Sequence, residues 1–178
     1  MSMLGARMSE RFLRQRGRLF GYACAVCGEG DLAADLVQDC AVRVLTARKV
    51  PVDETAFRAW LFKIVRNLWL DRLRRARGKW EVPFDDDVEH AVMPVPAETM
   101  IVDRLAVRQA FAKLSDHHRD VLALVDVGGF SYQETAILLD VSKGTIMSRV
   151  SRGRSALGRL LKQDNVIALD NRRERGRR

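Results

Sequence analysis

The chain has 178 residues, of which 31 are Lys or Arg and 23 are Asp or Glu, and its formal net charge is +8. It holds no apolar run of the roughly 18 residues that a membrane span needs, and residues 1–20 carry arginines in place of a secretory signal's apolar segment. We therefore expect a cytoplasmic protein with no membrane insertion. A pI near 10 predicts a polyanionic partner, and nucleic acid fits best because the basic residues are spread over several predicted helices.

Residues 1–80 predict an all-helical module. Its first helix is expected over about 8–27, where glycines end it. The second is expected over about 31–48, with Asp31 as a candidate N-cap. The third follows a proline-containing loop and is expected over about 54–77.

Apolar spacing assigns buried faces to the second and third of these helices. On the second helix the expected core residues are Leu32, Leu36, Val37, Val42 and Leu45. On the third helix the expected stripe is Phe57, Trp60, Leu61, Ile64, Val65 and Leu68, and Trp69 is also interpreted as packing. Residues 58–79 hold 8 basic side chains and 1 acidic one, Asp71, for which we predict an ion pair within the helix.

Residues 81–98 interrupt this helical pattern. They contain 6 acidic residues, no Lys or Arg, and three of the four prolines. Proline cannot continue a helix, and the stretch is too polar to form a core, so we interpret it as a flexible acidic linker. The acidic run at 85–87 is interpreted as solvated linker, since a metal site would need ligands from elsewhere.

Residues 99–163 predict a second helical module of four helices. The first is expected over about 98–114, and the second begins at about Ser115 and ends before paired glycines. Beyond this module, residues 164–178 are polar and strongly basic, and we expect them to be a disordered tail.

The last two helices of the second module predict a helix-turn-helix. Ser131 and Glu134 have the spacing of a capping box, which begins the third helix. Residues 140–142 leave room only for a turn, and Ser142 is a candidate cap for the fourth. That helix is expected to bury Ile146, Val150 and Leu157 and to turn Thr145, Ser148, Arg149 and Arg152 outward. A basic helix held across a turn is the shape that enters a DNA major groove.

The three cysteines do not indicate a disulfide framework or a metal site. Cys24 and Cys27 lie on one face of the first helix, and Cys40 is offset from Cys24 by roughly 7 Å along a helical hairpin at 1.5 Å per residue, which is marginal for a disulfide. A zinc site lacks a fourth ligand nearby, because the three histidines belong to other segments. We expect buried structural cysteines, no bound metal and no cofactor.

Three stretches together resemble one family. DLAADLVQDCAVRVL resembles region 2.2 of sigma factors, FRAWLFKIVRNLWLDRLRR resembles regions 2.3 and 2.4, and LSDHHRDVLALVDVGGFSYQETAILLDVSKGTIMSRVSRGRSAL resembles region 4. Their order and the intervening linker identify the chain as a member of the extracytoplasmic-function (ECF) group of the sigma-70 family. The resemblance implies an all-α fold of two small domains, region 2 over 1–80 and region 4 over 99–163.

The resemblance also implies partners and contact residues. The partners are promoter DNA, core RNA polymerase through its clamp helices and flap, and an anti-sigma factor that holds the chain inactive. The −35 element is expected to meet Ser142, Lys143, Thr145, Met147, Ser148, Arg149 and Arg152. The −10 element is expected to meet Arg58, Arg66, Asn67, Arg74 and Arg75. Core polymerase is expected to meet Asp35, Gln38 and Asp39.

Two residues depart from the family pattern. Met147 stands where relatives often carry a charged residue, which predicts an apolar contact with DNA or none. Asp140 stands where glycine is common in the turn, and aspartate adopts the left-handed conformation at some cost. We therefore expect the turn to be kept, in a less tight form.

Two other functions compete with the sigma-factor interpretation. A DNA invertase or resolvase also ends in a helix-turn-helix, but it needs an α/β domain with a serine nucleophile, and Ser2 and Ser9 lie in no predicted strand. A helix-turn-helix regulator that only occupies an operator gives no role to the basic helix at 58–79. No catalytic constellation is visible in the sequence, so we expect two cationic helical bodies that grip separate stretches of one template and no enzyme.

Overall fold

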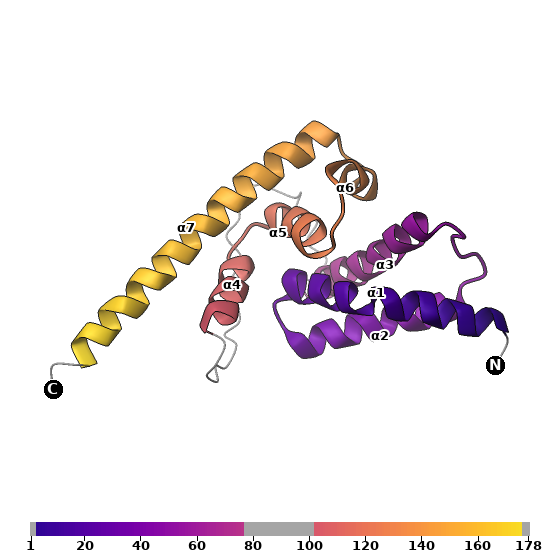
Figure 1. Ribbon diagram of the computed structural model, residues 1–178, viewed down its shortest axis with the longest axis horizontal. Helices are drawn as coiled ribbons and strands as arrows, with labels where there is room; N and C mark the ends of the chain where they lie inside the picture. The colour runs from indigo at the N-terminus through magenta and orange to yellow at the C-terminus, as the bar shows by residue number, and fades with distance from the viewer. Residues whose placement is uncertain (1–2, 77–101, 176–178) are drawn as a thin grey trace.

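The computed structural model describes residues 3–76 and 102–175, with side chains described over 7–76 and 106–162, and its regular elements are helical (Figure 1). The predicted all-α class is thereby confirmed for the described residues. The acidic stretch at 81–98 lies outside them. In the described part of the chain, no helix is both long enough and apolar enough to cross a membrane.

The first three helices form a bundle: α1 spans Met3–Cys27, α2 spans Gly30–Thr46 and α3 spans Glu54–Ala76. The three predicted helices are confirmed, with α1 beginning about five residues earlier than its expected start. The predicted N-cap of α2 is wrong. Glu29 occupies that position without a side-chain cap bond, and Asp31 lies in the first turn, where its charge favours the positive end of the helix dipole.

The buried face of α3 follows its sequence pattern, whereas that of α2 does not. On α3, four of the predicted residues are buried, and Phe62, which the pattern missed, is fully buried as well. On α2, Val42 and Leu45 are 56% and 60% exposed, so their prediction as core is wrong. The face that packs against α1 and α3 consists of Ala33, Leu36, Val37, Cys40 and Val44. Small Ala33 and Cys40 sit at its centre between Leu36, Val37 and Val44, and Val42 and Leu45 lie outside it.

The second module begins with α4 and continues through a helix that changes its hydrogen-bond pattern. Its elements are α4 (Val102–Ala112), α5 (Asp116–Leu122), the π-helix η1 (Ala123–Val127), α6 (Tyr132–Leu139) and α7 (Lys143–Arg175). The Gly128 amide donates to the Ala123 carbonyl at 2.8 Å, the spacing of a π-turn. The expectation of a disordered tail from 164 is wrong as far as Arg175, because no glycine or proline interrupts α7 over 159–175.

The two modules pack against each other, which the sequence did not predict. Figure 1 places α5 and α6 between the α1–α3 bundle and the long α7. Phe130, just before α6, meets Phe62 of α3 edge to face with ring centroids 4.8 Å apart, and Phe62 in turn meets Tyr22 of α1 at 5.3 Å. Glycine permits the close approach, since a Cβ on Gly21 of α1 would lie 2.9 Å from Val127 Cγ1 of η1. One hydrophobic core therefore continues from the first module into the second.

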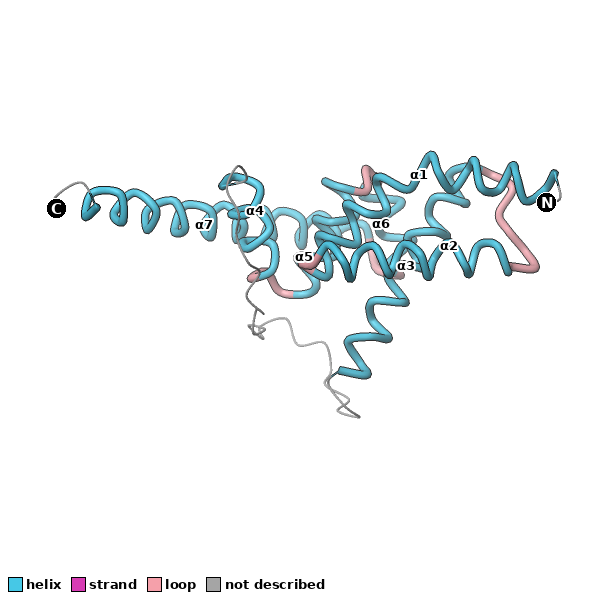
Figure 2. The backbone as a smooth tube through the Cα atoms, turned by 90° about the horizontal axis from the view of Figure 1, so that it is seen from below, coloured by secondary structure: helices cyan, strands magenta, loops and turns pink. Residues whose placement is uncertain are grey.

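The C-terminal turns of α3 leave this core. In Figure 2 they project beyond the other helices, and Arg74, Arg75 and Ala76 are exposed at their end. The basic end of α3 is thus presented to solvent, while its middle faces the second module.

Candidate nucleic-acid interface

The helix-turn-helix has the local structure that its sequence predicts. The Ser131 amide donates to Glu134 Oε2 at 2.8 Å and the Glu134 amide donates to Ser131 Oγ at 3.2 Å, so the capping box is confirmed. Asp140 adopts φ 56° and ψ 48°, the left-handed conformation expected of this turn. The Thr145 amide donates to Ser142 Oγ at 3.0 Å, which confirms Ser142 as the cap of α7.

The first turns of α7 have one buried face and one solvent face. Ile146 and Val150 are buried against α5 and α6, as predicted, while Leu157 is half-buried. The residues predicted to meet the −35 element lie on the other side or at its margins: Ser142, Lys143, Met147, Ser148 and Arg152 are exposed, and Thr145 and Arg149 are half-exposed. Neither Arg149 nor Arg152 has an ion pair or hydrogen bond within the described part of the chain. This surface is open to a ligand.

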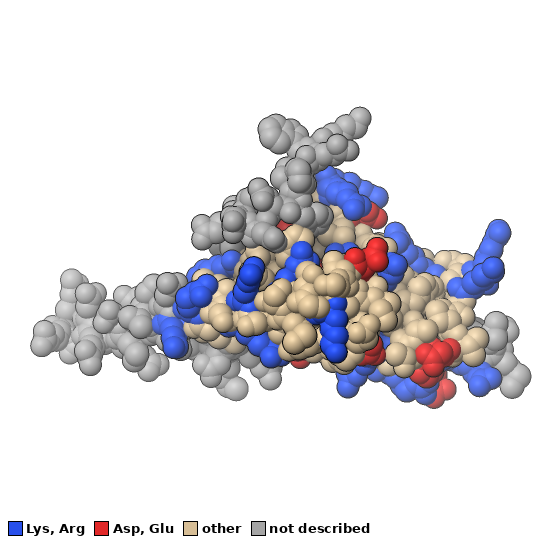
Figure 3. All heavy atoms as spheres, turned by 90° about the horizontal axis from the view of Figure 1, so that it is seen from above, with Lys and Arg blue, Asp and Glu red and all other residues tan. Residues whose placement is uncertain are grey.

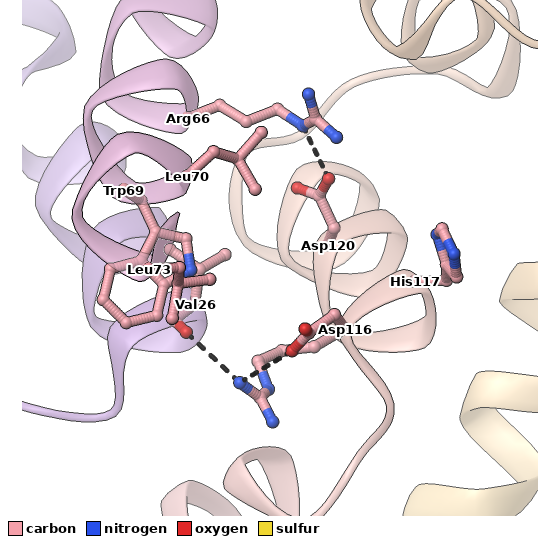
Figure 4. Close-up of a pocket in the computed structure, with 9 residues that line it drawn as sticks. Val26, Arg66, Trp69, Leu70, Leu73, Asp116, His117 and Asp120 are labelled. Atoms are coloured by element: carbon pink, nitrogen blue, oxygen red, sulfur yellow. Dashed lines mark hydrogen bonds and ion pairs between the residues drawn. The ribbon is translucent and has the colours of Figure 1, made fainter. Parts of the chain in front are cut away.

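Arg66, predicted to meet the −10 element, is instead paired across the two modules. Its Nε donates to Asp120 Oδ2 of α5 at 2.7 Å (Figure 4), and the Tyr22 hydroxyl donates to Asp120 Oδ1 at 2.9 Å. Burial acts to lower the pKa of Arg66, but the charge and hydrogen bond of Asp120 outweigh it and raise that pKa. Burial, followed by the charge of Asp120, raises the pKa of Tyr22 well above its usual value. Arg66 and Tyr22 thus hold one carboxylate between them.

Arg58, also predicted to meet the −10 element, forms a second link between the modules. Its Nη2 donates to Glu134 Oε1 of α6 at 3.0 Å, and its guanidinium lies 4.1 Å from the centre of the Phe130 ring. Hydrogen bonds from Ser131, with the charge of Arg58, lower the pKa of Glu134 against the effect of its partial burial. The capping residue of α6 therefore also binds α3.

The seam between the modules encloses a small space among polar and aromatic side chains. A cavity of about 30 Å³ lies between α3 and α5, beside Arg66, Trp69, Asp116 and Asp120 (Figure 4). That volume corresponds to about one water molecule. Across the same seam, Arg119 of α5 donates to the Val26 carbonyl of α1 at 3.4 Å. Polar groups of the chain itself therefore hold the two faces together.

The remaining residues of the predicted −10 set are not paired across the modules. Asn67, Arg74 and Arg75 are all exposed on α3. Arg74 pairs with Asp71 at 3.0 Å, which confirms the ion pair predicted within this helix. The five residues predicted to act together are thus divided into a covered pair, Arg58 and Arg66, and an exposed trio.

The predicted polymerase-binding residues occupy the exposed face of α2. Asp35, Gln38 and Asp39 are exposed, and Val42 and Leu45 lie on the same side at the spacing i, i+3, i+4, i+7 and i+10. Arg72 of α3 approaches the carboxylates of Asp35 and Asp39 at 3.8 and 3.7 Å. The face is therefore a mixed acidic and apolar stripe, not the purely polar one that the sequence indicated.

Neither the charged side chains nor the cysteines form a further candidate site in the part of the chain that the structure describes. Lys and Arg side chains are spread over the described part of the face shown in Figure 3 instead of gathering in one patch. Within the described residues, no cluster of His, Cys, Asp or Glu has the make-up of a metal site, and all three cysteines are free. Only Cys40 among them is fully buried, and burial raises its pKa to about 12, whereas Cys24 and Cys27 are half-buried.

A helix-turn-helix packed on a second helical module with an arginine-bearing helix defines a class of DNA-binding transcription factors. The Sigma-70 region 2 family model matches residues 12–79, and the Sigma-70 region 4 model matches residues 104–157. The chain belongs to the sigma-70 family, in its ECF group.

Individual relatives and a solved structure agree with this membership. The chain is 35% identical over 148 residues to the ECF sigma factor EcfG of Rhodopseudomonas palustris, covering 83% of this chain and 81% of that one. It is 32% identical over 151 residues to the ECF sigma factor SigL of Mycobacterium tuberculosis, covering 83% and 85%. The fold is similar to that of the sigma factor RpoE of Bartonella quintana, solved with the anti-sigma factor NepR, with TM-score 0.64 and 31% identity over 86% of this chain and 96% of that one.

Sequence reasoning missed the acidic partners of the α3 arginines. Asp120 and Glu134 were assigned no binding role beyond the cap, yet each neutralises an arginine of the other module. The available signal was the charge of residues 99–140, which hold 6 acidic and 4 basic side chains beside strongly basic segments. That imbalance indicates a complementary surface but does not say which residues meet.

Proposed function

We propose that this chain binds core RNA polymerase and directs it to promoters, with α7 on the −35 element and α3 on the −10 element. It acts by binding and not by catalysis, and it acts in the cytoplasm, where polymerase and its template are. The observation that carries the proposal is the capped helix-turn-helix, whose Arg149 and Arg152 have no ionic or hydrogen-bond partner among the residues that the structure describes, within a chain that matches both sigma regions.

The −35 element is read as duplex. Arg149 or Arg152 donates two hydrogen bonds to a guanine edge in the major groove, a contact that discriminates by roughly 1–3 kcal/mol. Lys143 and Thr145 position the helix through phosphates, which fixes register without specifying bases. Support comes from the exposure of this surface on a helix that the rest of the module holds rigidly by its buried face.

The −10 element is held as a separated strand along α3. Arg74 and Arg75 are exposed at the end of α3 that projects from the bundle, where a strand can approach without rearrangement, and Asn67 is exposed in the middle of the same helix. Arg58 and Arg66 join them only after α5 and α6 move away, because both guanidiniums are bound to carboxylates of the second module. The structure thus corresponds to a closed state of the proposed activity, and opening completes the −10 surface.

The modules can separate because the hydrogen bonds of the interface are incomplete and its arginines are partly exposed. Arg58 Nε is buried without a hydrogen-bond partner among the described residues, which costs about 1–3 kcal/mol relative to a paired donor. The Arg58 and Arg66 side chains remain 17% and 25% exposed, so water and phosphate oxygens can compete for them. The −10 and −35 elements are proposed to bind different modules. We infer that docking on polymerase holds these two binding surfaces apart and so separates the modules.

Core polymerase docks on the exposed stripe of α2. Asp35, Gln38 and Asp39 supply charge and hydrogen bonds, while Val42 and Leu45 supply apolar area that is otherwise left in water. The clamp helices are the proposed partner of this stripe, and the flap is the proposed partner of region 4. An anti-sigma factor is a further proposed partner, since the similar RpoE structure was solved with the anti-sigma factor NepR.

Run-off transcription tests the proposal. Core polymerase is incubated with the full chain and genomic fragments, and specific transcripts are expected only when the chain is present. The variant Arg149→Ala with Arg152→Ala should abolish them, while Lys162→Ala, an exposed cation on the same helix beyond the helix-turn-helix, should not. If the chain failed to bind core polymerase but bound a duplex specifically, the function would be that of an operator-binding regulator.

A further inference from the structure

One strip of the solvent face of α7, over its first four turns, consists of small side chains. Gly144, Ser148, Ser151 and Ser155 are exposed at the spacing i, i+4, i+7 and i+11, which places them in one row along the helix. Met147 lies beside this row and is 51% exposed. It is therefore a long apolar side chain with small neighbours on the surface that a major groove would face.

The serines beside Met147 use their hydroxyls within the helix. Ser148 Oγ donates to the Thr145 carbonyl at 2.9 Å, and Ser155 Oγ donates to the Ser151 carbonyl at 3.0 Å. Ser142 Oγ accepts the Thr145 amide and lies 2.8 Å from Thr145 Oγ1. The hydroxyl protons of Ser148 and Ser155 are thus directed at the helix backbone, and these two serines offer no donor to a base edge.

Cations flank the row of small side chains. Lys143 is exposed one turn before Met147 and on the same side of the row, and Arg152 is exposed on the other side. Arg154, which shares the Lys143 side, is held by Asp126 of η1 at 2.6 Å and is turned to its own module. A phosphate can therefore meet Lys143, a base edge can meet Arg152, and the small side chains between them leave room for the Met147 thioether to approach a base.

An exposed methionine in that position matches one group in the major groove. Among the four bases only thymine presents an apolar group there, its C5-methyl, while the other edges present hydrogen-bond donors and acceptors. A thioether satisfies none of those polar groups, but it packs well on a methyl because it is flexible and polarisable. Small neighbours let the helix approach closely enough for this contact.

We propose that Met147 determines specificity for a thymine in the −35 element by packing on its C5-methyl group. The inference rests on the proposed function and adds a base preference that the arginines do not supply. A methyl group removed from water by such a contact should contribute a three- to fivefold preference over the same base without the methyl.

Deoxyuridine gives a direct test, because it is thymine without the methyl. The full chain is used to select a −35 duplex from a random pool, and each thymine of the selected element is then replaced singly by deoxyuridine. Fluorescence anisotropy gives the affinity of wild type, Met147→Ala, Met147→Leu and Lys162→Ala for each duplex. One position should lose about three- to fivefold for wild type, Met147→Leu and Lys162→Ala, and nothing for Met147→Ala.

Three results would overturn the inference. Wild type and Met147→Ala could lose the same affinity at every substituted position, the selected element could lack thymine, or deoxyuridine could have no effect anywhere. Each leaves the proposed function standing, because a selected duplex was still obtained. If no duplex were selected at all, the proposed function itself would fail, and the inference with it. Since Met147 is exposed, its replacement leaves the core of the module intact.

Discussion

The two arginine-bearing helices of this protein carry similar charges and present them oppositely. On α7, Arg149 and Arg152 have no ion pair or hydrogen bond among the described residues, whereas on α3, Arg58 and Arg66 are bound to Glu134 and Asp120 of the other module. The proposed duplex-reading surface is therefore open in this structure, while two of the five residues proposed to bind the separated strand are covered. The difference shows that basic residues of one chain can be controlled separately by where its acidic residues fold.

The largest effect is expected from removing the carboxylate that Arg66 and Tyr22 share. Asp120→Ala leaves a half-buried guanidinium and a buried hydroxyl without a partner, at a cost of about 2–3 kcal/mol to the closed state. The radius of gyration from small-angle scattering should rise, and the free chain should bind a single-stranded −10 oligonucleotide more tightly. Asp126→Ala, which breaks an ion pair within the second module, should change neither. A compact Asp120→Ala molecule would show that the covered surface is not held by this pair.

A steric wedge should open the modules without altering any charge. Gly21→Leu places a side chain where even a Cβ lies 2.9 Å from Val127 Cγ1, and overpacking of this kind costs about 2 kcal/mol. Gly17→Leu is the matched control, because nothing lies within 4 Å of a Cβ at that position of the same helix. Scattering and −10 binding should report opening for the first variant alone. If both variants behaved like wild type, η1 would have shifted to accommodate the added side chain. The second module would then still cover α1 and α3, and the prediction of opening would be wrong.

Substituting the exposed arginines should separate base reading from charge. Arg149→Ala should lose about 1–2 kcal/mol on a −35 duplex and relax its preference at one base pair. Arg75→Ala should instead lower affinity at every promoter and reduce the salt dependence by about one phosphate contact. The measurement is duplex binding over a salt series. Equal loss of sequence preference in both variants would contradict the division between the two helices.

Tyr22 should make the closed state sensitive to alkali. Its folded-state pKa lies above the usual 10.0, so its contribution is intact below about pH 10 and is lost as the pH rises further. Tyr22→Phe removes the hydrogen bond to Asp120, costs about 1 kcal/mol, and should flatten this alkaline loss. Thermal unfolding followed at about pH 8 and about pH 11 tests both statements. If the Tyr22→Phe variant lost as much stability in alkali as wild type, the loss would come from another titrating group.

The smallest effect is expected from the exposed side of the interface. Glu134→Gln keeps an oxygen for the Ser131 amide but removes the charge facing Arg58, at about 0.5 kcal/mol. Because the folded-state pKa of Glu134 is lowered from 4.5, its contribution is present above that pH and is lost as the pH falls. Denaturant unfolding near pH 7 and near pH 4 should show a larger difference between wild type and Glu134→Gln at the higher pH. A difference that grew with acidity would contradict the assignment.

Local features of the molecule were set by the sequence alone. The capping box at Ser131 and Glu134, the left-handed Asp140 and the Ser142 cap each depend on residues within three or four positions of each other, so their spacing suffices to predict them. The stripe of α3 was predictable for the same reason, since one long helix repeats its apolar residues. The identity of the family also followed from these local motifs, taken in order.

Only the tertiary structure decided which charged residues are available. Arg58 and Arg66 are separated from their partners by 76 and 54 residues, and nothing in local spacing pairs α3 with Asp120 or Glu134. The same holds for α2, where Val42 and Leu45 satisfy a helical pattern but lie outside the face that small residues allow to pack. Helix periodicity reports which residues share a face, whereas the choice of the buried face and of ionic partners depends on the shapes that meet across the fold.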